Sequence, residues 1–408
     1  MRDLLPDIAA WKFALAAVLT TLMLAGIVAL ALGLGADEEP RQAGTATVGE
    51  KAQQTGTGKR RERKRRRATA GAQVAAIAER MPVEDRVAQL FLLGFQGQDL
   101  TAPIFERLRG EALGGIAIDA HNYTTVEQLA SLAGEAGVIA EQEGNVRPWV
   151  LAPQEGGEFN AFPDLPPATA AGDLASAADA AAEAGQAAQT LGDAGLSGLL
   201  GPVIDVGPPD GLAVGARAFS ADPRDVADYA RAVVGAYRAQ SLLTAPGHFP
   251  GLGSGSEDTR LGPSQVGSSI AELSAHDLVP FRAAIRAGAP AITMSNGLYV
   301  TDDFVTPGSL SPSLIGGLLR RDLGFRGIVV TDDLSDPGVT ALTTTPAASV
   351  AAIRAGADLV YISGPASEQQ AAYDAVLKAV RAGKLSPGRI KEALLRNLSV
   401  KRNYGLME

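Results

Sequence analysis

Two adjacent carboxylates, Asp332 and Asp333, directly follow a run of four β-branched residues, Ile328–Thr331. Such residues favour strands, and an unbroken apolar run is typical of a strand in a parallel sheet that is covered on both faces. A carboxylate at the carboxyl end of such a strand can act as a nucleophile, an acid or a base at an open site. We therefore predict that the chemistry is organised around Asp332. Asp333 has an equally simple structural interpretation as the N-cap of the next helix.

Other polar residues occupy the same position after apolar runs elsewhere in the chain. They are Glu155, Asp205, His248 and Asn296. The chain has no cysteine and only three histidines, which excludes thiolate metal sites and argues against a histidine-rich one. We therefore predict no metal and no cofactor, and a site built from carboxylates and their polar neighbours.

The elements that must position these residues alternate along the chain. Eight short apolar runs are each followed by a helical pattern, and they cover residues 90–95, 115–118, 149–152, 199–206, 242–245, 291–294, 328–331 and 359–363. Eight successive strand–helix units predict an α/β fold, a (β/α)8 TIM-type barrel, in which the carboxyl ends of the strands form the functional face. A doubly wound open sheet is the alternative, but it requires a glycine-rich phosphate loop after the first strand, and residues 94–97 match one poorly.

A glycine-rich segment after the fifth predicted strand reads Pro-Gly-His-Phe-Pro-Gly-Leu-Gly and then Ser-Gly-Ser-Glu-Asp-Thr-Arg-Leu-Gly, over residues 246–262. It resembles the signature loop of glycoside hydrolase family 3, in particular its β-N-acetylhexosaminidase branch. Further stretches resemble that family in the same order along the chain: Gln154–Gly157, Gly201–Val206, Gly215–Pro223, Leu310–Pro312 and Thr331–Leu334. The resemblance covers residues 81–364 and implies a barrel that hydrolyses glycosidic bonds.

The resemblance implies roles for several residues. Asp332 corresponds to the family's nucleophile and Arg217 to an arginine that binds the sugar. Arg260 stands where this branch has the histidine that acts as general acid/base, and an arginine stays protonated and only donates hydrogen bonds. We therefore predict that Glu257 or Asp258 donates the proton and that Arg260 binds an anionic or polar part of the substrate. The alternative is that both carboxylates are solvated or pair with Arg260.

Four further residues complete the predicted substrate site, namely Glu155, Asp205, His248 and Asn296. For His248, a buried position in the turn is an equally good interpretation. For Asp205, the alternative is a structural role in fastening the barrel rim.

Two classes of function follow from these residues. The retained Asp332 and Arg217 favour a glycosidase that acts on amino-sugar-containing wall material by a retaining mechanism. The replaced histidine favours a catalytically impaired relative that binds glycan or a partner protein. We predict the hydrolase, with a carbohydrate as its partner and no nucleic acid.

The N-terminal part has a different character from the rest of the 408-residue chain. Residues 13–36 contain no charge, which is long enough for a helix that spans a bilayer. We predict a tail over 1–12, a single transmembrane helix over 13–36, a disordered basic linker over 37–71 and the barrel domain over 72–408. The basic run at 59–67 either binds anionic lipid or wall polymer or is simply solvated. Basic residues near the span are balanced between its two sides, and we expect a cell-membrane protein with an extracytoplasmic barrel.

Overall fold

The computed structural model describes residues 70–407. The predicted membrane helix over 13–36 and nearly all of the predicted linker lie outside the described residues. Between residues 70 and 407, no helix has both the length and the apolar character needed to cross a membrane. The described part begins with a helix over residues 70–80.

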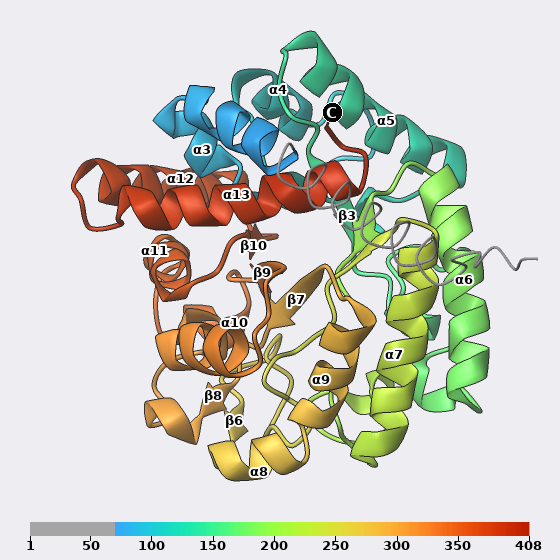
Figure 1. Cartoon of the computed structure of the whole chain (residues 1–408). Helices are drawn as coiled ribbons and strands as arrows, with labels where there is room; N and C mark the ends of the chain where they lie inside the picture. The colour runs from blue at the N-terminus through green and yellow to red at the C-terminus, as the bar shows by residue number, and fades with distance from the viewer. Residues whose placement is uncertain (1–69, 408) are drawn as a thin grey trace, which may run out of the picture. The chain divides into compact units, whose positions relative to one another are not determined.

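Eight parallel strands form the centre of the domain (Figure 1). They are β1 (Phe91–Leu93), β2 (Gly115–Ala117), β3 (Trp149–Ala152), β4 (Gly198–Leu199), β5 (Leu243–Thr244), β7 (Ala291–Met294), β9 (Ile328–Thr331) and β10 (Val360–Ile362). Six of them pair in the order β10-β1-β2-β3-β4-β5, and β7 pairs with β9. Parallel bridges between Phe249 and Met294 and between Val330 and Leu359 join the two sets. The ring is therefore closed, and the predicted barrel is confirmed.

Helices follow the strands and surround them (Figure 1). Those of the α type are α3 (Val83–Ala88), α4 (Pro103–Gly110), α5 (Val126–Gln142), α6 (Ala177–Asp193), α7 (Pro223–Ala239), α8 (Ile270–Ala275), α9 (Leu278–Ala287), α10 (Pro337–Thr340), α11 (Thr345–Ala355), α12 (Ala366–Arg381) and α13 (Pro387–Asn403). After β7 the connection is a π-helix, η7 (Ser313–Asp322). Short 3₁₀ turns are η1 (Ala120–Asn122), η2 (Gly157–Phe159), η3 (Ala171–Asp173), η4 (Gly215–Arg217), η5 (Val300–Asp302) and η6 (Gly308–Leu310).

The sequence patterns indicated no bounds for α4 and missed a small parallel pair, β6 (Gln265–Val266) with β8 (Leu298–Tyr299). Both strands of this pair have only two residues, which is too short to produce a periodic signal.

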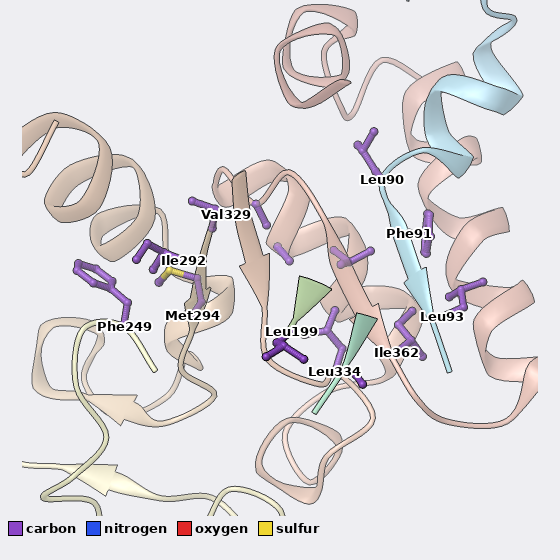
Figure 2. Close-up of a cluster of buried hydrophobic side chains, with 14 of the residues drawn as sticks. Leu90, Phe91, Leu93, Leu199, Phe249, Ile292, Met294, Val329, Leu334 and Ile362 are labelled. Carbon is purple, nitrogen blue, oxygen red and sulfur yellow. The ribbon is translucent and has the colours of Figure 1, made fainter. Parts of the chain in front are cut away.

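Strand residues alternate between two apolar layers, as the period of a strand requires. On β1, Phe91 and Leu93 pack outward beneath the helices, and the ring of Phe91 meets that of Tyr373 from α12 edge to face at 6.0 Å. Leu92 belongs to the separate cluster inside the barrel. Figure 2 shows side chains of the outer layer, among them Phe91 and Leu93.

The N-terminal end of the barrel is closed by α13. The indole Nε1 of Trp149, at the start of β3, donates a hydrogen bond to Oδ1 of Asn397 on α13 (2.7 Å), and the fully buried Lys401 donates to Oε1 of Gln89 (2.9 Å). Because this end is packed shut, the carboxyl ends of the strands form the open face.

Candidate active site

A cavity of about 390 Å³ opens at the carboxyl ends of the strands. Segments that follow β2, β3, β4, β5, β9 and β10 all contribute to its wall. Six of the predicted site residues line it: Glu155, Arg217, His248, Asp258, Arg260 and Asp332. The topology of the barrel thus brings together residues that are separated by up to 177 positions in the sequence, from Glu155 to Asp332.

Asp332 lies directly past the end of β9. Its Oδ1 accepts a hydrogen bond from the backbone N–H of Asp333 at 3.0 Å. Burial raises the pKa of Asp332, while the charge of His248, the Asp333 N–H and the charge of Arg217 oppose that rise. The carboxylate therefore faces the cavity with cations beside it and little direct hydrogen bonding, which suits a nucleophile.

Asp333 has a structural role, but not the one the sequence suggested. Its Oδ1 accepts hydrogen bonds from the backbone N–H groups of Ser335 (2.8 Å) and Ser363 (3.1 Å), so it joins the end of β9 to the end of β10. The next helix, α10, begins three residues later with Asp336 as its N-cap. Asp333 therefore stabilises the contact between the ends of β9 and β10, and its interpretation as a helix cap was wrong.

His248 is held by Asp205. Oδ2 of Asp205 accepts from the backbone N–H of His248 (3.0 Å) and lies 2.7 Å from its Nδ1, and Oδ1 accepts from the N–H of Leu252 (2.7 Å). Burial alone would lower the pKa of His248, but the charge and hydrogen bond of Asp205 and the charge of Asp332 raise it to about 9. His248 therefore presents an imidazolium to the cavity at neutral pH.

Asp205 itself is fully buried behind His248 and does not line the cavity, so it positions the histidine loop and is not a substrate contact. The alternative that Asp205 fastens the rim is the one that the geometry supports.

Arg217 bridges two carboxylates of the cavity wall. Its guanidinium is 6% exposed and lies 3.6 Å from Glu155 and 3.3 Å from Asp258. Asp258 is also gripped by Arg260, whose Nε lies 3.1 and 3.0 Å from the two carboxylate oxygens and whose Nη2 lies 2.6 Å from Oδ2. Burial raises the pKa of Asp258, but the hydrogen bonds from Arg260 and the charge of Arg217 outweigh it and leave that pKa below its ordinary value. A carboxylate held ionised in this way is a poor proton donor.

Besides Asp205, two further predicted site residues lie away from the cavity wall. Glu257 does not line the cavity, and its carboxylate lies against Gly262 of the same loop. Asn296 is fully buried: its Nδ2 donates to the backbone oxygen of Asp333 (2.7 Å), and its Oδ1 accepts from Ser309 (2.6 Å). Asn296 therefore supports the turn after β9 from behind.

Besides Asp119 and Glu158, sequence reasoning missed a third acidic residue of the cavity, Asp336. In the sequence it precedes Pro337, which is the ordinary signature of a helix N-cap and carries no sign of a site. Only the packing of the β9–α10 connection places its side chain in the cavity.

These features define a class of protein. A closed parallel barrel presents a buried carboxylate, a second acidic group and flanking cations in a cavity at the carboxyl ends of its strands, and this is the arrangement of a barrel glycosidase.

Comparison with known proteins agrees with that class. The profile of the glycosyl hydrolase family 3 N terminal domain matches residues 82–400. Beta-hexosaminidases from Stenotrophomonas maltophilia (strain K279a) and Xylella fastidiosa (strain 9a5c) are 32% and 33% identical to the chain over 287 residues, covering 68% of this chain and 84% of each relative. The chain belongs to glycosyl hydrolase family 3 and is a glycosidase.

Solved structures give the same result. A family 3 β-N-acetylglucosaminidase from Paenibacillus sp. str. FPU-7 matches with a TM-score of 0.75 and 29% identity, over 80% of this chain and 63% of that one. A β-N-acetylhexosaminidase from Beutenbergia cavernae DSM 12333 matches with a TM-score of 0.71 and 29% identity, over 79% of this chain and 99% of that one. The chain thus spans less than two thirds of the Paenibacillus protein and nearly all of the Beutenbergia protein.

Proposed function

We propose that this chain is a retaining β-N-acetylhexosaminidase that acts on the amino sugars of cell-wall glycans, with Asp332 as its nucleophile. The observation that carries the proposal is the Asp332 carboxylate, which is partly buried in the cavity at the open end of the barrel and lies within the influence of the cations His248 and Arg217. Their positive charge favours the ionised carboxylate that a nucleophile requires.

The proposed reaction has two steps. In the first, an oxygen of Asp332 forms a bond to the anomeric carbon while the glycosidic oxygen leaves with a proton from an acid in the site. In the second, water attacks the same carbon, gives up a proton to that group and releases Asp332 as a carboxylate. Two inversions give net retention at the anomeric carbon.

The substrate class is supported by the size of the site and by the relatives. A cavity of about 390 Å³ is within the range of small-ligand sites, on the order of 300–1,000 Å³. The similar proteins carry the names beta-hexosaminidase and β-N-acetylglucosaminidase. An N-acetylated amino sugar is therefore the residue that we expect in the cavity.

The test compares hydrolysis of an aryl N-acetyl-β-glucosaminide and an aryl β-glucoside by the wild type and by Asp332→Asn. We expect turnover of the first substrate by the wild type only, with the β-anomer released first, as seen by proton NMR. A slow fluorinated glycosyl donor should label a peptide that contains Asp332. Equal turnover by wild type and Asp332→Asn would overturn the assignment of the nucleophile.

We also propose that residues 13–36 anchor the protein in the cell membrane with the barrel on the extracytoplasmic side, and that the basic run at 59–67 binds anionic lipid or wall polymer. The support is the uncharged length of the segment. The test is fractionation of cells that express the full chain or a chain without residues 13–36, followed by protease treatment of intact cells. Recovery of both chains in the soluble fraction would contradict the anchor.

A second candidate is a glycan-binding protein without turnover, and one observation favours it. Arg260 replaces the expected histidine, and Asp258 is held ionised between Arg217 and Arg260. Calorimetry with N-acetylglucosamine and muropeptide fragments separates the candidates, because binding with no product formation supports only the second.

A further inference from the structure

Two helices of the domain begin with the same local sequence, Asp-Pro. At the start of α7, Oδ1 of Asp222 accepts a hydrogen bond from the backbone N–H of Arg224 (2.7 Å), which is an ordinary side-chain cap. At the start of α10, Asp336 occupies the same N-cap position, but its side chain makes no capping hydrogen bond. The carboxyl of Asp336 lines the cavity instead.

The position of Asp336 is set by the contact between two loops. The backbone N–H of Gly338, in the first turn of α10, donates to the oxygen of Thr259 (2.8 Å) in the segment that follows β5. This contact holds the start of α10 against the segment after β5, and Asp336 lines the cavity together with Asp332 and Arg260, whose charges both act on it. Among residues 70–407, no group donates a hydrogen bond to the Asp336 carboxyl, so the group is available to a ligand.

The charges around Asp336 favour its protonated form. Burial raises its pKa, and the negative charges of Asp332, Asp333 and Asp258 raise it further, while Arg260 lowers it; the result is a pKa of about 9. Asp336 therefore retains its proton at neutral pH. When two carboxyl groups in one cavity have different surroundings, their pKa values differ. The group that keeps its proton can then act as the acid, and the ionised group can act as the nucleophile.

The other acids of the segment after β5 fit the role less well. Asp258 is kept ionised by its two arginines, and Glu257 does not line the cavity. Arg260 cannot cycle a proton under ordinary conditions.

We propose that Asp336 is the general acid/base of this chain, in place of the histidine whose position Arg260 occupies. The inference rests on the proposed glycosidase function. In the first step the Asp336 O–H transfers its proton to the glycosidic oxygen as the bond from that oxygen to the anomeric carbon breaks and Asp332 bonds to the same carbon. In the second step the Asp336 carboxylate takes a proton from water as the water oxygen displaces Asp332.

The experiment compares two substrates that differ in their need for a proton. An alkyl N-acetyl-β-glucosaminide has a poor leaving group, whereas a 2,4-dinitrophenyl N-acetyl-β-glucosaminide needs no acid. For Asp336→Asn we expect kcat/KM to fall about 1,000-fold on the first and less than about 10-fold on the second. Azide should raise kcat of the variant on the activated substrate and form a β-glycosyl azide, because azide attacks without a base.

The pH profile gives a second readout. Wild-type kcat/KM on the alkyl substrate should fall as the pH rises through about 9, because the acid form of Asp336 is lost there. The variant on the activated substrate should lack the part of that limb that comes from Asp336, whereas the part that comes from His248, whose pKa is also about 9, should remain. Asp332, Asp333, Asp258 and Arg260 are the charged groups that face Asp336 and enter the same profile.

Matched variants keep the test decisive. Asp222→Asn makes the same change at the other Asp-Pro helix start, outside the cavity, and should leave both substrates and the azide response unaltered. Asp336→Ser also removes the carboxyl but leaves a residue that suits the N-cap position, so that the start of α10 is not disfavoured. An equal loss on both substrates, or no loss on either, overturns the role of Asp336 while wild-type turnover leaves the proposed function intact. A wild type that cleaves neither substrate overturns the proposed function and, with it, this inference.

Discussion

Two aspartates, Asp358 and Asp332, lie at opposite ends of neighbouring strands of the barrel, and their surroundings differ sharply. Asp358 lies just before β10 at the closed end, with no exposed surface. It accepts hydrogen bonds from Arg320, Arg389 and Arg396 and from the backbone N–H of Val329 (3.1 Å). Asp332 lies just after β9 at the open end, and within the described residues 70–407 its carboxylate accepts a hydrogen bond only from the N–H of the next residue.

These surroundings distinguish a structural acid, Asp358, from an acid that is available for chemistry, Asp332. The carboxylate oxygens of Asp358 are occupied by protein donors, so that residue ties η7 and α13 to the bottom of the barrel. The Asp332 carboxylate is surrounded by charge but largely free of donors, so a substrate atom can approach it. Conservative changes at the two positions should therefore damage different properties, stability in one case and catalysis in the other.

The largest effect is expected at the open end. Asp332→Asn should lower kcat by about 1,000-fold or more, because it removes the nucleophile. Its free energy of unfolding should stay equal or rise at neutral pH, since a buried carboxylate with a raised pKa is replaced by a neutral amide. Steady-state kinetics and urea unfolding test both statements, and turnover comparable to that of the wild type would contradict them.

The opposite result is expected at the closed end. Asp358→Asn leaves three arginines without their shared carboxylate and should lower the free energy of unfolding by about 3 kcal/mol. Activity per folded molecule should change little. Asp322→Asn is the matched control, because Asp322 pairs with Arg321 on the surface. If Asp358→Asn were no less stable than this control, the comparison would fail.

A smaller effect on catalysis is expected at Arg217, which bridges Glu155 and Asp258 in the cavity wall. Arg217→Ala should lower kcat/KM by about 100-fold, because two carboxylates lose a buried charge-assisted partner worth about 1.5–3 kcal/mol. Arg231→Ala removes an exposed arginine that pairs with Asp228 on α7 and should have no such effect. Equal kcat/KM for these two variants would show that Arg217 has no special role.

The smallest effect is a pH-dependent change in stability at His248. Its folded pKa of about 9 lies above the ordinary value of 6.5, so the pair with Asp205 stabilises the fold fully below about pH 6.5 and loses that contribution as the pH rises through 9. His248→Gln should therefore be less stable than the wild type by about 2 kcal/mol at pH 6, with the gap closing above pH 9.

Thermal unfolding between pH 6 and 10 measures this gap. His276→Gln is the control, because His276 lies beside Asp277 with 49% of its side chain exposed. A gap for His248→Gln that did not depend on pH would contradict the raised pKa.

Much of the architecture was predictable from the sequence. β3, β7 and β9 have the predicted bounds, because buried parallel strands are continuous apolar runs between polar turns. β4 is shorter than predicted: the strand is Gly198–Leu199, at the start of the predicted run 199–206, and the irregular segment that follows it carries Asp205. Apolar content alone does not distinguish a strand from a buried turn.

By itself, the sequence determined the barrel fold, the family, and the position of Asp332 at the open end of a barrel strand. Apolar periodicity and local motifs are properties of neighbouring residues, so they can be read without the tertiary structure. Tertiary structure decided the roles of the other acids, since hydrogen-bond partners and burial come from distant segments. It placed Asp205 and Asn296 behind the wall, kept Asp258 between two arginines and left Glu257 outside the cavity. It also placed Asp336, an ordinary helix start in the sequence, in the cavity with Asp332, where burial and nearby negative charges raise its pKa, because the pKa of a carboxyl depends on the charges that the fold gathers around it.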